Sequence, residues 1–235
     1  MSPSPLFHNR REAGERLAQA VQVELKHLQT RTAASPVVFA LPRGGVPVAE
    51  PVAERLGCPL DIVVAKKITQ PENPELAIGA VTADGHVLWS AHRMGSTPSD
   101  SYEVALQKAK FKARSQMEQL ACGCPRINPS GKIAILVDDG IATGMTMAVA
   151  VQALRAQQAG EVWLCAPVAP MELMDTLEQW GDRVIVLATP SPFYSVSRFY
   201  REFAQVETTI ALAHLQQYYR HFREDTSPLP DPEEE

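Results

Sequence analysis

The stretch from Ile133 to Thr146 constrains the fold most, because an apolar segment is followed there by two acids, a small-residue turn and a helix start. Residues 133–137 are all apolar and three are β-branched, which is typical of a parallel strand buried on both faces. Asp138 and Asp139 follow this strand directly, and open α/β sheets bind ligands at the carboxyl ends of their strands. We therefore expect an α/β fold with a site at this edge.

The residues after the acids predict an anion-binding helix start. Gly140 and Gly144 allow a close backbone approach, and Thr143 is the expected N-cap of a helix over 144–158 that stops at Gly160. The first turn of a helix offers unpaired N–H groups to an anion. A ribose phosphate suits such a site, since its hydroxyls can meet the acids and its phosphate the amides. The alternative is an ordinary strand–turn–helix with two solvated acids.

Other phosphate motifs do not match. The glycines lack the spacing and the following lysine of a P-loop, and G-x-G-x-x-G occurs nowhere. The segment Leu136–Thr146 instead resembles the phosphoribosyl-pyrophosphate (PRPP) motif of type I phosphoribosyltransferases. This resemblance implies that Asp138 and Asp139 are catalytic and bind the ribose hydroxyls. It implies that the 5-phosphate is bound by Ile141, Ala142, Thr143, Gly144, Met145 and Thr146.

A second strand-turn-helix pattern covers residues 36–56. By itself it fits a tight turn with a surface arginine as well as an anion site. In type I phosphoribosyltransferases a loop at this place binds pyrophosphate, and Arg43, Gly44 and Gly45 resemble it. That loop often contains a non-proline cis peptide, which we expect at this turn.

A third segment, Asp61–Ile68, is predicted to be a strand that ends in two lysines. The resemblance implies that Lys66 or Lys67 contacts pyrophosphate, with Lys67 also counted as catalytic. The Pro-rich residues that follow imply a flexible loop from Lys66 to Glu75 or further, which closes over the reacting centre. The segments around 41–49 and 73–80 resemble a group of bacterial phosphoribosyltransferase-domain proteins with no assigned acceptor.

The remaining pattern alternates helices and strands, which predicts a doubly wound, mostly parallel sheet with helices on both faces. This is the type I phosphoribosyltransferase fold, with a small hood and flexible-loop region. Helices are expected over 10–30, from Ser99 or Asp100 to 120, over 171–180 and over 207–222; strands over 162–168 and 184–188; a hairpin over 81–89; and irregular structure over 190–200.

Length and charge indicate one domain with a tail. The chain of 235 residues carries a formal charge of −5, and residues 224–235 contain six acids and no base. We expect a phosphoribosyltransferase-like domain over 1–223 and an acidic, disordered tail over 224–235. The charge argues against a nucleic-acid partner, and no apolar run is long enough for a membrane span. A cytoplasmic location is expected. Cys58 and Cys165 are expected in the core, and Cys122 and Cys124 lack the companions of a zinc site.

The expected activity is transfer of the 5-phosphoribosyl group from PRPP to a nitrogenous acceptor, with release of pyrophosphate. Mg²⁺ is the expected cofactor, held through PRPP and water near Asp138 and Asp139 rather than by direct protein ligands. The family also implies a homodimer, and an acceptor hood built from 7–11 and 190–203. No residue identifies the acceptor; Arg10, Arg11, Arg198 and Arg201 are candidates, while the aromatic residues of the hood either line a base pocket or pack. Two alternatives remain: a PRPP-sensing regulator, and a ribose-phosphate hydrolase or phosphorylase.

Overall fold

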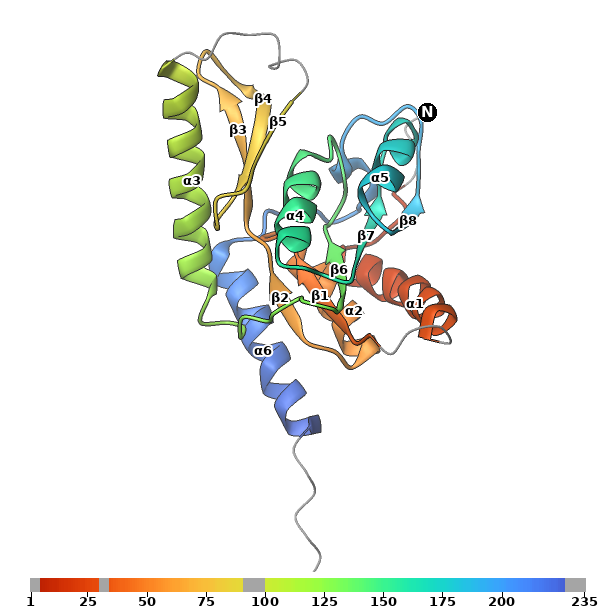
Figure 1. The fold of residues 1–235 in the computed structure, drawn as a ribbon. Helices are drawn as coiled ribbons and strands as arrows, with labels where there is room; N and C mark the ends of the chain where they lie inside the picture. Colours follow the sequence, from red (N-terminus) through yellow and green to blue (C-terminus); the bar gives the residue numbers. More distant parts are fainter. Residues whose placement is uncertain (1–4, 30–33, 91–99, 227–235) are drawn as a thin grey trace, which may run out of the picture.

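A five-stranded parallel sheet forms the centre of the molecule. The computed structural model describes residues 5–29, 34–90 and 100–226 (Figure 1). The strand predicted at 133–137 is the middle strand β6 (Ile133–Val137), and every one of its residues is buried. The order is β2-β1-β6-β7-β8, in which the other strands are β1 (Pro36–Ala40), β2 (Leu60–Ile62), β7 (Glu161–Val168) and β8 (Arg183–Ala188).

Helices cover both faces of this sheet, which confirms the doubly wound α/β fold. Along β6, alternate side chains enter two separate cores: Ile133 and Ile135 enter one, and Ala134 and Leu136 enter the other. The first core is covered by α1 (Arg10–Gln29), α2 (Val46–Leu56) and α6 (Thr208–Thr226), and the second by α4 (Met145–Ala156) and α5 (Met174–Trp180).

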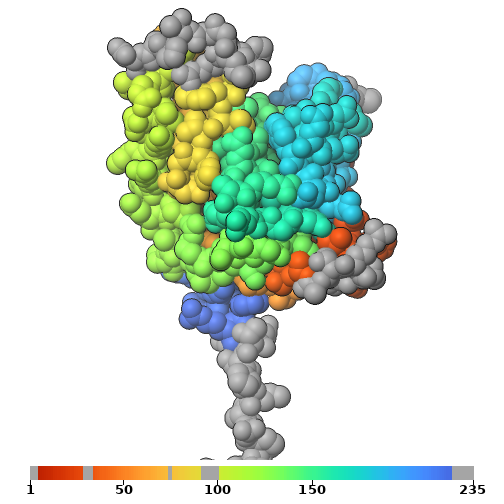
Figure 2. All heavy atoms as spheres, viewed as in Figure 1, coloured from red at the N-terminus to blue at the C-terminus, as the bar shows by residue number. Residues whose placement is uncertain are grey.

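A smaller antiparallel sheet stands beside the parallel one. It consists of β3 (Ala65–Gln70), β4 (Asn73–Thr82) and β5 (Val87–Trp89), in that order. The hairpin predicted over 81–89 is thereby confirmed in the pairing of β4 with β5. Helix α3 (Asp100–Leu120) packs along this sheet, and the space-filling view shows the visible, yellow part of the sheet between α3 and α4 (Figure 2).

The prediction of a single strand over Asp61–Ile68 is wrong in one respect, because these residues contribute to two strands that belong to two different sheets. β2 ends at Ile62, where its partner β1 also ends, and Val63 N–H donates the last hydrogen bond to Ala40 O. The chain then crosses over and begins β3 at Ala65, which pairs with Thr82 of β4. The apolar run continues through the crossing, so its pattern could not reveal the change of partner.

The loop predicted from Lys66 to Glu75 is also corrected, since these residues form the β3–β4 hairpin. Lys67 pairs with Ala80 and Gln70 with Asn73, so the turn is confined to Pro71 and Glu72. The ladder changes register twice near this turn. Proline is accommodated at a turn and at irregular positions of a ladder, so a Pro-rich segment can form a hairpin as it does here.

The other expected elements are confirmed with small changes at their ends. The helix predicted over 171–180 begins as the 3₁₀ turn η2 (Met171–Leu173), and the irregular segment 190–200 contains a second one, η3 (Val196–Phe199). Cys58 and Cys165 lie in the core. Helix α6 includes the first residues of the predicted tail, up to Thr226, whereas 227–235 and Ser99 lie outside the described residues. Within the described ranges, no helix has both the length and the apolar character needed to cross a membrane.

Candidate functional site

The two loops predicted to bind a phosphorylated sugar lie side by side at the carboxyl edge of the parallel sheet. Ala40 and Val137 are register partners, so β1 and β6 end at the same level (Figure 1). The contact continues beyond the strands, because a Cβ placed on Gly44 would lie 2.7 Å from Asp139 Cγ and overlap its carboxylate. Gly44 therefore allows the carboxylate of Asp139 to lie against the loop that follows β1.

The two acids are held differently. Asp138 Oδ1 accepts the N–H of Asp139 at 2.8 Å, and burial raises the pKa of Asp138 well above its usual range, with the charge of Asp139 adding to the rise. Burial also raises the pKa of Asp139, but Arg10 opposes that rise. The pair therefore keeps a proton more readily than exposed carboxyl groups do.

Arg10 is the residue of the expected hood that reaches the acids. Its Nε donates to Asp139 Oδ2 at 2.8 Å, its Nη1 donates to Ala204 O at 2.7 Å, and its guanidinium lies 3.7 Å from the centre of the Phe203 ring. Tyr200 holds the backbone of the same acid, because its hydroxyl donates a hydrogen bond to Asp139 O at 2.6 Å. Tyr200 belongs to the aromatic residues of the expected hood, and the sequence contains no signal for this hydrogen bond.

The other hood candidates do not converge on the acids. Arg11 pairs with Glu15 and Glu54, and Arg198 lies over the ring of Tyr194. Arg201 is exposed. For most of the aromatic residues the packing alternative holds: Phe7, Phe199 and Tyr200 form a small core against which Phe193 and Phe203 pack, whereas Tyr194 is exposed.

The loop after the acids forms a small pocket of about 170 Å³ lined by Asp138, Lys67 and residues 140–144, 146 and 147. Among the described residues, the backbone N–H groups from Ala142 to Thr146 have no hydrogen-bond acceptor, whereas the N–H of Ile141 donates to Val168 O. Such a row of free amides at a helix N-terminus attracts anions.

The helix cap differs from the predicted one. Thr143 is not the N-cap: α4 begins at Met145 with Gly144 as its cap residue, and no side chain caps the helix. Gly144 has φ +72°, a left-handed conformation that glycine adopts without a steric penalty. At the other end α4 stops at Ala156, before the predicted Gln158. The absence of a side-chain cap leaves the first amides of the helix available to a ligand.

The loop after β1 contains the expected non-proline cis peptide, between Pro42 and Arg43. Gly45 N–H donates to Leu41 O and closes the turn. The N–H groups of Arg43 and Gly44 have no acceptor among the described residues. This loop therefore offers a second set of free amides next to Asp139.

The two neighbouring lysines of β3 line different pockets. Lys67 is exposed and lines the phosphate-loop pocket together with Asp138. Lys66 is half-buried and lines a separate pocket with Arg43 and Lys112. Its pKa is lowered, first by burial and then by these two cations. The sequence left open which of the two lysines faces the pyrophosphate. Alternation along the strand places the side chains of Lys66 and Lys67 on opposite faces.

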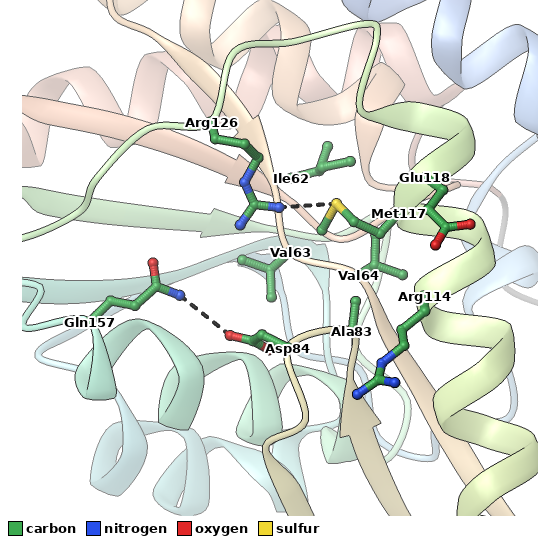
Figure 3. A pocket seen from close by; sticks show the side chains of 10 residues that line it. All are labelled: Ile62, Val63, Val64, Ala83, Asp84, Arg114, Met117, Glu118, Arg126 and Gln157. Carbon is green, nitrogen blue, oxygen red and sulfur yellow. Dashed lines mark hydrogen bonds between the residues drawn. The ribbon is translucent and has the colours of Figure 1, made fainter.

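A further pocket of about 240 Å³ lies apart from the acids (Figure 3). Valines 63 and 64 form an apolar floor, and a polar rim includes a hydrogen bond from Gln157 to Asp84. Neither acid and no residue of the two anion loops lines it, so it is not part of the candidate site.

The carboxylate oxygens of Asp138 and Asp139 are the donor type that Mg²⁺ prefers. The described residues contain no group of three or more His, Cys, Asp or Glu side chains placed to hold a metal ion by themselves. An ion near the acids would therefore need oxygens from a ligand and water to complete its coordination.

The chain is similar to known proteins over most of its length. The family model "Phosphoribosyl transferase domain" matches residues 17–186, which include both loops and both acids. "Putative phosphoribosyl transferase Rv0571c" of Mycobacterium tuberculosis H37Rv is 37% identical over 221 residues, which are 93% of this chain and 48% of that protein, and its counterpart in strain CDC 1551 matches equally. The chain thus spans about half the length of these curated relatives. The crystal structure of TT1426 from Thermus thermophilus has 32% identity and a TM-score of 0.74, covering 90% of this chain and 98% of that one. The chain belongs to the phosphoribosyl transferase domain family.

Proposed function

We propose that the protein transfers the 5-phosphoribosyl group from PRPP to a nitrogenous small molecule and releases pyrophosphate. One observation carries this proposal: a pair of partly buried acids lies between two separate sets of free backbone amides at one edge of the sheet. PRPP has the matching layout, with ribose hydroxyls between a 5-phosphate and a pyrophosphate. Membership of the family supports the same chemistry.

In the proposed complex, Asp138 and Asp139 accept hydrogen bonds from the ribose hydroxyls. The amides from Ala142 to Thr146 bind the 5-phosphate, and Ile141 anchors that loop through its bond to Val168. The pyrophosphate lies at the amides of Arg43 and Gly44, with Gly45 closing the turn. The cationic side chains of Arg43, Lys66 and Lys67 neutralise it.

The proposed reaction is a displacement at the anomeric carbon. A lone pair of the acceptor forms the new bond, and the electron pair of the breaking C–O bond leaves with pyrophosphate. Asp138 and Asp139 compensate the positive charge that develops on the sugar, and Lys67 stabilises the leaving oxygen. Mg²⁺ held near Asp138 and Asp139 would supply further neutralisation of the pyrophosphate. The protein needs no covalent nucleophile for this chemistry.

The proposal includes a homodimer, which the family resemblance implies, and a location in the cytoplasm. All four cysteines are free thiols, which fits a reducing compartment. The regulator and the hydrolase or phosphorylase remain the alternatives. A regulator would bind PRPP without turnover, and a hydrolase would consume PRPP without an acceptor.

Calorimetric titration of PRPP with Mg²⁺ into the full chain tests the proposal, with ribose 5-phosphate and pyrophosphate as separate titrants. We expect micromolar affinity for PRPP and its loss in the double variant Asp138→Asn, Asp139→Asn. Asp175→Asn is the matched control, because Asp175 is exposed on α5. Equal PRPP affinity in the double variant and the parent would refute the roles of the acids. Turnover of PRPP with a panel of nitrogenous bases then separates transferase from regulator.

A further inference from the structure

A second cationic pocket lies beside β3, away from the pocket of the phosphate loop. It has a volume of about 400 Å³ and lies between β3, α3 and the start of α6. Figure 1 shows α3 running along β3 and ending near α6. Because Lys66 and Lys67 are consecutive in one strand, their side chains leave it on opposite faces. The pocket that contains Lys66 is therefore distinct from the one that contains Lys67 and Asp138.

Three cations from three different elements line this pocket. Arg43 comes from the loop after β1, Lys66 from β3 and Lys112 from α3. They are close enough that Arg43 and Lys112 both lower the pKa of Lys66, after the larger effect of burial. No acid is among the described residues that line the pocket, and the nearby Glu207 pairs with Arg43 at 3.2 Å while remaining largely exposed. The pocket thus gathers positive charge that an anion would neutralise.

Gln116 is the second, independent sign of a ligand. This α3 residue is only 7% exposed and lines the pocket, and its Oε1 has no hydrogen-bond partner among the described residues. Buried polar atoms are almost always paired, so an unpartnered one at the wall of a cavity indicates a missing partner. A carboxamide can present either its oxygen to a hydroxyl or its NH₂ group to an oxyanion.

We propose that this pocket binds the phosphate group of a small molecule, with Arg43, Lys66 and Lys112 as its cations and Gln116 as its hydrogen-bond partner. Three convergent cations and one amide suit a phosphate, which accepts several charge-assisted hydrogen bonds. The phosphate can come from two sources. One is the pyrophosphate end of PRPP, reached past the amides of Arg43 and Gly44, and this case rests on the proposed function. The other is a separate phosphorylated molecule that binds in addition to PRPP, and in that case Lys67 and the loop amides, not Arg43 and Lys66, bind the pyrophosphate of PRPP.

Pyrophosphate titrated calorimetrically into the full chain is the direct probe. We expect Lys112→Ala and Gln116→Leu each to weaken pyrophosphate binding, Lys112→Ala by about tenfold, and to leave ribose 5-phosphate binding unchanged. Lys112 is exposed, so its removal should not disturb folding, and Gln116→Leu replaces an unpartnered polar group with an apolar one of similar size. Lys110→Ala is the control, because it removes the same charge from the same helix outside the pocket.

The two sources give different results with PRPP. If the pocket holds the pyrophosphate end of PRPP, both variants lower the affinity for PRPP by the same factor as the affinity for pyrophosphate, and pyrophosphate competes with PRPP for binding. If it holds a separate molecule, PRPP affinity is kept, and pyrophosphate still binds the PRPP-saturated parent but binds PRPP-saturated Lys112→Ala about tenfold more weakly. The proposal is overturned if both variants bind pyrophosphate as the parent does. Failure of the proposed function is separate: the parent would not bind PRPP, yet pyrophosphate binding would still depend on Lys112.

Discussion

Arg10 and Asp139, which are 129 positions apart, form a hydrogen-bonded ion pair of 2.8 Å between Nε and Oδ2. Both side chains are largely buried, with 11% and 16% of their surfaces exposed. One of the two acids at the candidate site is thereby oriented by the first residue of α1. The guanidinium also opposes the rise that burial causes in the pKa of Asp139, which favours the ionised carboxylate that can accept hydrogen bonds from a sugar.

Replacing Arg10 by Met removes this cation and keeps most of the apolar stem. Arg10 then no longer opposes the effect of burial on Asp139, so the pKa of Asp139 rises further and its carboxylate becomes protonated at a higher pH. We expect PRPP affinity to fall about tenfold near neutral pH. As the pH is lowered, the variant should lose PRPP binding at a higher pH than the parent does. Titrations from about pH 5 to about pH 8 check this. Arg11→Met is the control, and tighter binding in Arg10→Met would mean that Arg10 competes with the sugar.

Gly44→Ala should impair binding with little effect on folding. The new Cβ would overlap the Asp139 carboxylate, a side-chain group that can move, so the acid leaves both its ligand position and Arg10. We expect at least about a tenfold loss of PRPP affinity, measured by calorimetry. An affinity equal to that of the parent would show that the place of Asp139 beside the loop is unimportant.

The neighbouring Gly45→Ala serves as the contrast. Its Cβ would lie 2.5 Å from Leu41 O and 2.8 Å from Val137 O, which are backbone atoms of the sheet edge. We expect the free energy of unfolding to fall by about 2 kcal/mol, because the backbone must shift to make room. Denaturant unfolding curves measure this change. Equal stability of the two alanine variants would contradict the distinction between a movable carboxylate and a fixed backbone.

Asp138→Asn should stabilise the fold while weakening PRPP binding. The pKa of Asp138 is raised in the folded protein, so the folded state binds a proton that the unfolded state has released, and stability declines as pH rises through this interval. Asparagine removes that penalty and can still accept the N–H of Asp139. We expect a gain of about 1 kcal/mol at pH 7 that disappears below about pH 4. Thermal melts of the parent and the variant at both pH values measure this gain, with Asp175→Asn as the control. A gain in stability that did not depend on pH would contradict the prediction.

Asp61 should matter for stability through its hydrogen bonds rather than its charge. This fully buried carboxylate in the middle of β2 accepts the N–H of Ile127 at 2.8 Å and that of Ile62 at 2.7 Å. Asp61→Ala leaves the Ile127 amide without a partner, and we expect a loss of about 3 kcal/mol in the free energy of unfolding. Asp61→Asn keeps an acceptor and should remain within about 1 kcal/mol of the parent. If both variants lose the same stability in urea unfolding, the charge is the important property.

Local sequence order determined the central part of the fold and the candidate site. Residues 133–137 are apolar without interruption, so they could be recognised as the buried middle strand, and the acids that follow could only lie at its carboxyl end. The Pro-Arg-Gly-Gly turn is likewise predicted from its local order, whereas the cis peptide before Arg43 is expected from the resemblance to the family. Such features depend on neighbours within a few positions, which is why they could be predicted from the chain alone.

Tertiary structure decided everything that depends on a partner far along the chain. The apolar run through Val63 and Val64 did not reveal that it changes sheets, because the end of β1, not the run itself, ends β2. Strand register placed Lys66 and Lys67 in different pockets, since a shift of one residue reverses the face of a strand. Packing of α1 and α3 brought Arg10 to Asp139, and Lys112 and Gln116 to Lys66. The sequence specifies the chemistry of these side chains, but only burial and the meeting of distant elements determine which groups face one another.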